Sequence, residues 1–114
     1  MTGKPEAELL EDNRLIVWDP VQARSLYNDD FYGKPLGTPR PKEDFDEPLL
    51  LDPVEALYLL DKKRIKIRKN GKSFSSKKFK ETIASKFQDF NEKYQVYSDL
   101  RKQGYVVTPG IKYG

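Results

Sequence analysis

Residues 49–60 read LLLDPVEALYLL, a pattern that predicts a strand running directly into a short, largely buried helix. Asp52 has a side chain suited to the N-cap of that helix, and Pro53 suits the first helical position, where a backbone N–H needs no partner. Glu55 falls at the third position, from which its carboxylate can reach back to the N-cap in a capping box. The helix should end near Lys62, because a cation is favourable at a helix C-terminus.

Two further strands are predicted on either side of this unit. Residues 64–68 alternate polar and apolar side chains, as in a strand with one buried face, and Asn70-Gly71 directly after them predicts a tight turn. Nearer the N-terminus, the apolar run 14–18 predicts a strand. Asp19 can then cap a short helix over residues 20–28.

A long helical pattern follows the predicted turn, from about residue 77 to residue 102. Ser75 or Ser76 can cap it. The pattern is long for a globular protein, so we expect a bend or break near Gln88 and Asp89. Its apolar residues recur every three or four positions, which predicts one buried stripe: Phe79, Ile83, Phe87, Phe90, Tyr94, Tyr97 and Leu100.

The segment 29–48 is rich in proline and glycine, which exclude a long helix or a central strand. We expect a loop there that packs through Phe31, Tyr32 and Leu36. Strands separated by helices, with one hairpin-like turn, favour a mixed arrangement over a doubly wound one. We therefore predict the α/β class, more fully α+β: a small mixed, mostly antiparallel sheet packed with two or three helices.

The C-terminal residues predict two more strands. Gly104 lies where a helix C-cap is expected, residues 105–108 restart as a strand, and Pro109-Gly110 forms a turn. Residues 111–114 then begin a further strand that the sequence does not complete. This predicts either a continuation of the chain or a partner chain that supplies the neighbouring strand.

The composition excludes several classes of site. The 114 residues include neither cysteine nor histidine, so the chain alone cannot form a disulfide framework, a zinc site of these ligands, or a nucleophile paired with histidine. Catalysis through carboxylates, lysine or tyrosine stays open. The sequence contains neither a bilayer-spanning apolar run nor the apolar core of a signal peptide. We therefore expect a soluble, intracellular, cytoplasmic protein. We expect no membrane partner, metal or cofactor.

The charge of the chain is unevenly distributed. Residues 62–80 carry ten basic and no acidic side chains, whereas residues 1–61 carry six basic and fourteen acidic ones. Such a basic patch attracts phosphate backbones, which predicts RNA binding. There are two alternatives: an ordinary solvated face, or an assembly surface that pairs with Glu43, Asp44, Asp46 and Glu47. The candidate RNA-binding residues are Lys62, Lys63, Arg64, Lys66, Arg68, Lys69 and Lys72.

Four segments carry a resemblance to a known family: YGKPLG at 32–37, LDPVEALYLL at 51–60, FNEKYQVYSDLR at 90–101 and GYVVTPGIKYG at 104–114. In this order and spacing they resemble the N-terminal region of the archaeal-type tRNA-splicing endonucleases. The resemblance spans about residues 15–114, and its most specific parts are the third and fourth segments.

The resemblance implies a metal-independent RNA endonuclease that removes introns from precursor tRNA at a bulge-helix-bulge fold. An RNA 2′-hydroxyl attacks the adjacent phosphate and displaces the 5′-oxygen of the next nucleotide, which leaves a 2′,3′-cyclic phosphate and a 5′-hydroxyl. Each active subunit joins an N-terminal α/β domain to a C-terminal catalytic domain in a dimer or tetramer. In the catalytic domain a tyrosine acts as the base, a histidine as the acid, and a lysine stabilises the charged transition state. These roles suffice because the RNA itself supplies the nucleophile.

The resemblance implies that none of these catalytic residues falls within the chain. The element Lys112-Tyr113-Gly114 lies just before the catalytic tyrosine in the family, so Tyr113 is not the base. We expect residues 1–114 to form a single N-terminal-like domain, with the passage to an absent catalytic domain beginning at about residue 105. It would be inactive alone and partnered by the catalytic domain or subunit and precursor tRNA. A free-standing RNA-binding module and a purely structural assembly domain are the alternatives.

Overall fold

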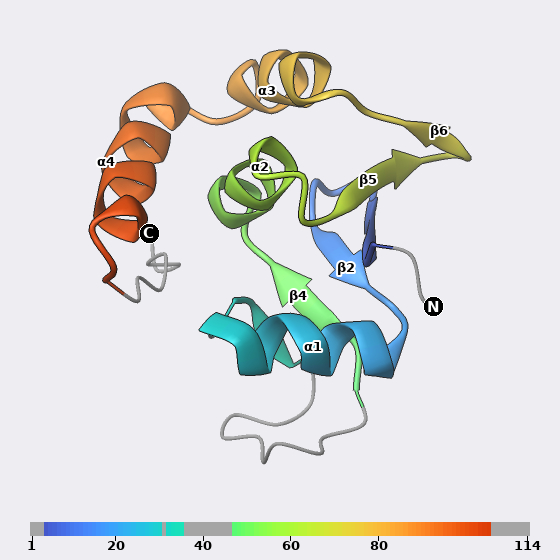
Figure 1. Ribbon diagram of the computed structural model, residues 1–114. Helices are drawn as coiled ribbons and strands as arrows, with labels where there is room; N and C mark the ends of the chain where they lie inside the picture. Colours follow the sequence, from blue (N-terminus) through green and yellow to red (C-terminus); the bar gives the residue numbers. More distant parts are fainter. Residues whose placement is uncertain (1–3, 31, 36–46, 106–114) are drawn as a thin grey trace.

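The structure is a computed structural model that describes residues 4–30, 32–35 and 47–105 (Figure 1). Pairs of short strands are separated by single helices along most of this length. In chain order the elements are β1 (Glu6–Leu9), β2 (Leu15–Val17), α1 (Pro20–Asp30), β3 (Lys34–Pro35), β4 (Leu49–Leu51), α2 (Pro53–Asp61), β5 (Lys66–Lys69), β6 (Lys72–Ser73), α3 (Ser76–Ala84) and α4 (Phe90–Lys102). Of these, β2, β4 and β5 correspond to the three strands predicted from the sequence in this part of the chain.

The strands form one mixed sheet in the order β3-β4-β2-β1-β5-β6. β1 runs parallel to β5, while the β1–β2, β2–β4, β3–β4 and β5–β6 pairs are antiparallel. The predicted α+β class with a mostly antiparallel sheet is therefore confirmed. The described residues form four helices rather than two or three, because the long helical pattern is divided into α3 and α4.

The two faces of the sheet differ in chemistry. Cross-strand register places Leu9 opposite Leu15, and Ala7 opposite Ile67, on a face where all four side chains are buried. Residues of α2, α3 and α4 complete the same hydrophobic cluster, which includes Leu57, Phe79 and Tyr97. On the opposite face, β1 and β5 present the polar residues Glu6, Glu8, Lys66 and Arg68, whereas β2 and β4 present Ile16 and Leu50.

Strand β1 is the central element that the sequence analysis did not predict. Its four residues alternate exposed Glu6 and Glu8 with buried Ala7 and Leu9. This alternation of exposed and buried residues covers only four positions. Glutamate and alanine are both depleted in strands, so the strand propensity of these residues does not predict β1. β1 forms because pairing with β2 and β5 satisfies its backbone on both sides.

The predicted helix caps are confirmed. At α2, the Val54 N–H donates to Asp52 Oδ1 at 2.9 Å, and the Asp52 N–H donates to Glu55 Oε1 at 3.1 Å, which completes the capping box. The Val21 N–H donates to Asp19 Oδ1 at the start of α1, and the Lys78 N–H donates to Ser75 Oγ at the start of α3.

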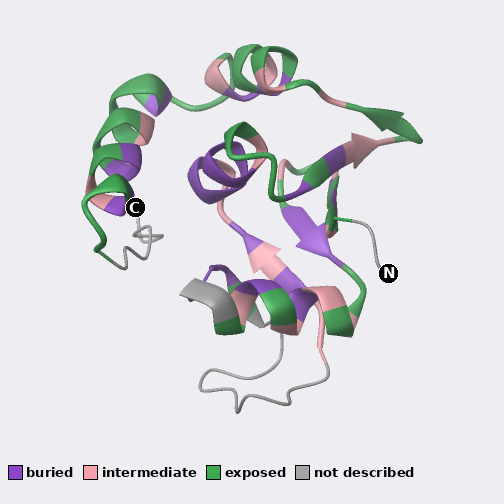
Figure 2. Cartoon of the chain, viewed as in Figure 1, coloured by how far each residue is buried: buried purple, intermediate pink, exposed green. Residues whose placement is uncertain are grey.

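The predicted helix break lies at residues 85–89, where Asp89 adopts a φ of 60° before α4 begins. The break removes Phe87 from the expected buried stripe, and its side chain is 40% exposed. Phe79, Ile83, Phe90 and Tyr97 are buried as predicted. Figure 2 shows buried positions on both α3 and α4. α4 thus returns to the core at a new angle, which one continuous helix could not achieve.

Some predictions lie outside the described residues. Phe31 and Leu36 are among these, whereas Tyr32 is described and buried. The predicted strands at 105–108 and 111–114 are represented by Tyr105 alone, which is 60% exposed and lies outside any strand. The predicted C-cap at Gly104 is described: its φ is 94°, and the Tyr105 N–H donates to the Leu100 carbonyl at 3.1 Å.

Gly33 occupies a position that only glycine fits. Its φ is 77°, and a Cβ there would lie 2.7 Å from Leu49 Cδ2 and 2.9 Å from the Leu50 carbonyl oxygen. Gly71 has a similar φ of 81°, but a Cβ would meet nothing within 4 Å. The two glycines therefore share a backbone constraint and differ in steric surroundings.

We expect Gly33→Ala to lower the free energy of unfolding by roughly 3 kcal/mol, since it adds a steric clash with β4 to the backbone strain. Gly71→Ala is the matched control and should cost only about 1 kcal/mol, the strain alone. Urea denaturation followed by circular dichroism measures both. Equal losses in the two variants would contradict the close packing of residue 33 on β4.

Candidate functional site

A buried carboxylate lies where three segments of the chain meet. Glu55, at the third position of α2, is 3% exposed. Its Oε1 accepts the Asp52 N–H at 3.1 Å, and its Oε2 accepts the Gly33 N–H at 2.9 Å. One side chain therefore caps its own helix and anchors the segment that leads into β3.

Helix α4 supplies the positive charge of this cluster. Arg101 is 7% exposed, and its guanidinium carbon lies 4.2 Å from the ring centre of Tyr32. The Arg101 Nε–H donates to Tyr97 Oη at 3.1 Å, and the Tyr97 ring packs edge-on against Tyr58 at 5.6 Å. We call Tyr32, Gly33, Glu55, Tyr97 and Arg101 the buried polar cluster.

Burial dominates the electrostatics of this cluster. It raises the pKa of Glu55 to about 7, against the opposing effects of the Gly33 and Asp52 N–H groups and of the Arg101 charge. Burial and the nearby Glu55 carboxylate also raise the pKa of Tyr97. A carboxyl group that titrates near neutrality can serve as an acid or base, but Glu55 and Arg101 are too enclosed to meet a macromolecular substrate. The arrangement is suited to joining segments of the fold.

The sequence pattern predicts Glu55 in the capping box and predicts no role for Arg101. The bond from Gly33 to Glu55 spans 22 residues, so helix-capping rules do not predict it. One local signal was available for Arg101, which lies four residues after Tyr97 on the buried side of α4.

The candidate RNA-binding residues lie along the α2–β5 connection and the β5–β6 hairpin, and three of them already have partners. Arg68 Nη2 lies 3.3 Å from Glu6 Oε2, and Lys69 Nζ lies 3.9 Å from Glu11 Oε1. Lys62 Nζ lies 5.5 Å from the ring centre of Tyr58. Their charges are thus partly compensated by β1, the turn after it and α2.

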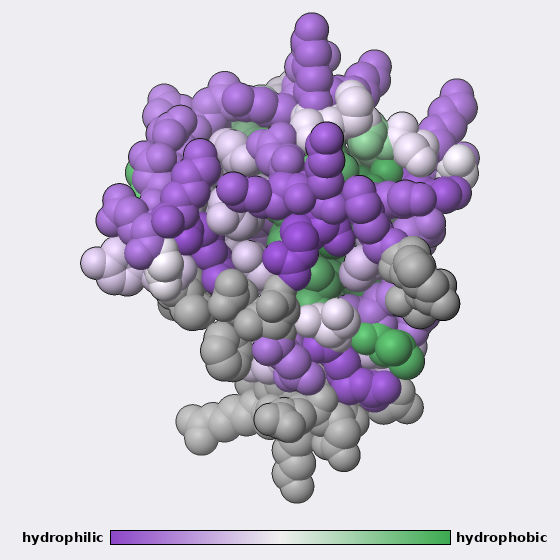
Figure 3. Space-filling view, viewed as in Figure 1, coloured by the Kyte–Doolittle hydropathy of each residue, from purple (hydrophilic) through white to green (hydrophobic). Residues whose placement is uncertain are grey.

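Three of the other candidates are more available. Lys63, Lys66 and Lys72 are exposed, and no carboxylate of the described residues forms an ion pair with them. Arg64 is exposed as well but has an interaction of its own. In Figure 3 hydrophilic side chains cover most of the visible surface around α3 and the hairpin. The structure therefore leaves a smaller cationic surface than the sequence suggested.

The acidic side chains proposed to pair with this segment were Glu43, Asp44, Asp46 and Glu47, and the first three lie outside the described residues. In the described part of the chain, Arg68 and Lys69 of the segment form ion pairs with Glu6 and Glu11. Among the described residues, no group of three potential metal ligands occurs. Within the same ranges, no helix is both long and apolar enough to cross a bilayer.

Comparison with known proteins gives two family matches. Residues 7–80 match the tRNA intron endonuclease N-terminal domain, and residues 90–114 match the tRNA intron endonuclease catalytic C-terminal domain. The second match begins at the first residue of α4, within the unit whose core contains Phe90 and Tyr97.

Individual relatives agree with these matches. The chain is 40% identical over 109 residues to a tRNA-splicing endonuclease of Saccharolobus solfataricus, 36% identical over 109 residues to one of Sulfurisphaera tokodaii, and 40% identical over 103 residues to one of Hyperthermus butylicus. These alignments cover 93%, 94% and 89% of the chain but 60%, 60% and 57% of the relatives. The chain thus spans about three fifths of the length of these relatives.

The raised pKa of Glu55 predicts a pH dependence of stability. The pKa rises from an ordinary 4.5 to about 7 on folding, so between these values the folded chain holds a proton that the unfolded chain has released. The contribution of this bound proton to the free energy of unfolding is therefore fully present below about pH 4.5 and is lost as the pH rises through 7. We expect the free energy of unfolding to fall by roughly 2 kcal/mol between about pH 5 and pH 8.

Glu55→Gln should flatten this decline, because a glutamine side chain does not titrate. Glu92→Gln, at an exposed position in the first turn of α4, removes one carboxylate as a control and should leave the decline in place. Urea unfolding at several pH values measures all three proteins. If Glu55→Gln kept the wild-type slope, the assignment of the titration to Glu55 would be wrong.

Proposed function

The chain belongs to the tRNA-splicing endonuclease family, and on this basis we propose that it is the N-terminal structural part of such an enzyme. In this role it supports the excision of introns from precursor tRNA at a bulge-helix-bulge fold. Catalysis then requires the tyrosine, histidine and lysine of a catalytic domain or subunit.

The shared core of the N-terminal elements and α4 is the observation that carries this proposal. Phe90 and Tyr97 of α4 belong to the same hydrophobic cluster as the buried residues of the sheet. The described residues therefore form a packed unit up to the end of α4, and this supports treating the chain as one N-terminal domain. The family's catalytic domain or subunit would follow from this unit.

The chemistry of the cluster agrees with a structural role. The RNA supplies the nucleophile in the family reaction, so the protein needs a base, an acid and a charge that stabilises the transition state. The chain contains no histidine that could be the acid. Glu55 and Arg101 are enclosed: Glu55 accepts the Gly33 N–H and so joins α2 to the segment before β3, and Arg101 packs on Tyr32.

RNA binding by the basic surface is the second candidate function, and the exposure of Lys63, Lys66 and Lys72 favours it. Exposed lysines contact phosphates without reading bases, so such binding would support the substrate without selecting the cleavage site. The two functions are compatible, because the family substrate is itself an RNA.

The main proposal predicts that the purified chain alone leaves a bulge-helix-bulge RNA intact. Gel analysis of the end-labelled RNA, with a fully paired duplex as the control substrate, measures this. Addition of a catalytic domain or subunit that completes the enzyme should produce cleavage with a 2′,3′-cyclic phosphate end. Specific cleavage at the bulges by the chain alone would overturn the proposal.

The RNA-binding role predicts that neutralising Lys63, Lys66 and Lys72 to glutamine weakens RNA binding about tenfold. The slope of log affinity against log salt concentration should become shallower by roughly two to three, because each phosphate that a lysine neutralises contributes about one unit to it. Fluorescence anisotropy with a labelled RNA duplex at several salt concentrations gives both quantities.

The matched control neutralises Lys62, Arg68 and Lys69, which removes the same number of charges from side chains that already have partners. Its effect should be clearly smaller. Equal losses of affinity in the two triple variants would show a general charge effect, and unchanged binding in both would remove direct RNA contact by this segment.

A further inference from the structure

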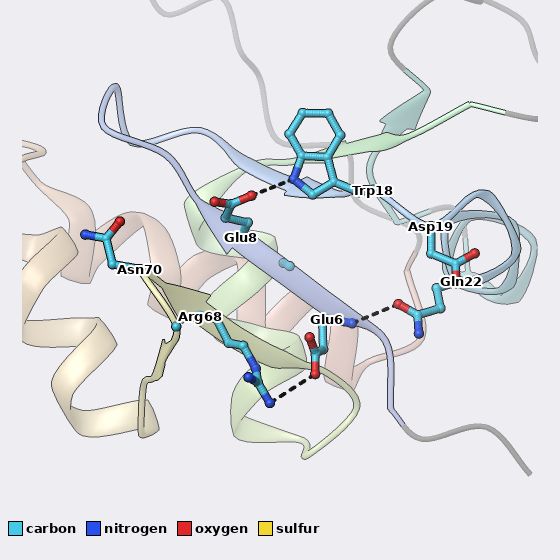
Figure 4. A pocket seen from close by; sticks show the side chains of 9 residues that line it. Glu6, Glu8, Trp18, Asp19, Gln22, Arg68 and Asn70 are labelled. Carbon is cyan, nitrogen blue, oxygen red and sulfur yellow. Dashed lines mark hydrogen bonds and ion pairs between the residues drawn. The ribbon is translucent and has the colours of Figure 1, made fainter.

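The polar face of the sheet carries a pocket of about 430 Å³. It is bordered by β1, by the residues between β2 and α1, and by the β5–β6 turn (Figure 4). Pockets of this size are typical of binding sites for small groups or peptide side chains. Among the residues that line the pocket, only Arg68 is also a candidate residue for RNA binding.

Trp18 forms one wall of the pocket and is the only tryptophan of the chain. Its side chain is 51% exposed, although the indole Nε1–H donates to Glu8 Oε1 at 2.7 Å. This bond holds the nitrogen edge of the ring beside Glu8 (Figure 4), while about half of the Trp18 surface stays exposed. A large aromatic side chain held in this way beside a pocket is suited to binding.

The charge of the pocket favours a cationic ligand. Its carboxylates are Glu6, Glu8 and Asp19, whereas Arg68 is its single cation. Arg68 pairs with Glu6 at 3.3 Å, which leaves the charges of Glu8 and Asp19 in excess. A phosphate group would be repelled by this excess, while a guanidinium or ammonium group would be attracted to the carboxylates and to the indole face.

A hydrogen-bond donor is also available for a polypeptide backbone. The Gln22 side chain uses its Oε1 to accept the Glu6 N–H at 3.1 Å, so its amide nitrogen can donate to a ligand. Peptide carbonyl groups are natural acceptors for such a donor. The pocket therefore combines an aromatic surface, excess negative charge and an amide donor.

From these features we propose that the pocket docks an arginine or lysine side chain of a partner polypeptide. The cationic group packs on Trp18 and faces Glu8, and the adjacent peptide backbone accepts a hydrogen bond from Gln22. The inference goes beyond the proposed function, because it assigns a protein-binding surface on the side of the sheet opposite the hydrophobic core.

The single tryptophan makes the pocket directly observable by fluorescence. A short capped peptide with a central arginine is titrated into the intact chain, and the same peptide with citrulline, which has a similar shape but no charge, is the control ligand. We expect a saturable change in Trp18 emission with the arginine peptide and at least roughly tenfold weaker binding of the citrulline peptide. Equal affinities, or no saturable change, would overturn the proposal.

Two further titrations distinguish other occupants. A nucleoside monophosphate that binds more tightly than the arginine peptide would contradict the proposal and indicate a nucleotide site. Emission that changes with the concentration of the chain alone, and that the peptide does not reverse, would indicate a second copy of the chain and would equally contradict it.

Glu8→Gln tests the role of charge within the pocket, since glutamine can still accept the Trp18 N–H. It should weaken binding of the arginine peptide roughly fivefold, whereas Glu81→Gln on the exposed side of α3 should leave binding unchanged. Circular dichroism confirms that both variants are folded. The proposal fails if folded Glu8→Gln binds the peptide as tightly as Glu81→Gln does.

Discussion

The buried carboxylate of Glu55 is the constraint on which the other parts of the structure depend. An enclosed carboxylate is costly unless its oxygens are bonded and a cation is near. Here the bonds come from Asp52 and Gly33. Burial still raises the pKa of the carboxyl to about 7, and the nearby Arg101 charge opposes part of that rise. Satisfying Glu55 thereby joins the start of α2 to the segment before β3, and the end of α4 lies near enough for its charge to act on the carboxyl.

This arrangement gives a physical reason for the motifs that carry the family resemblance. The YGKPLG segment provides Tyr32 and Gly33, the helix α2 segment provides Glu55, and the α4 segment provides Arg101. The first family match ends at residue 80 and the second begins at residue 90. The hydrophobic core is not divided at this point, because α4 contributes Phe90 to it. A structural unit and a sequence match thus have different limits in this chain.

Local chemistry made much of the fold predictable. The capping box at Asp52, the turn at Asn70-Gly71 and the break near Asp89 each follow from residues close together in the sequence. Tertiary placement decided the features that were missed. β1 forms through its neighbours, and Arg68 is less free to bind RNA because β1 brings Glu6 beside it. Sequence proximity carries no information on such partners, so the candidate site was predicted as a charged segment and not as individual available side chains.

Native-state hydrogen exchange tests most directly whether α4 belongs to the unit built around Glu55. Our account predicts that the amides of Tyr97, Ser98 and Arg101 open with the same free energy, within about 0.5 kcal/mol, as those of Leu57 and Leu59 in α2. Both sets should match the global free energy of unfolding. If the α4 amides exchanged through an opening several kcal/mol less costly than that of α2, the central role of the buried polar cluster would be contradicted.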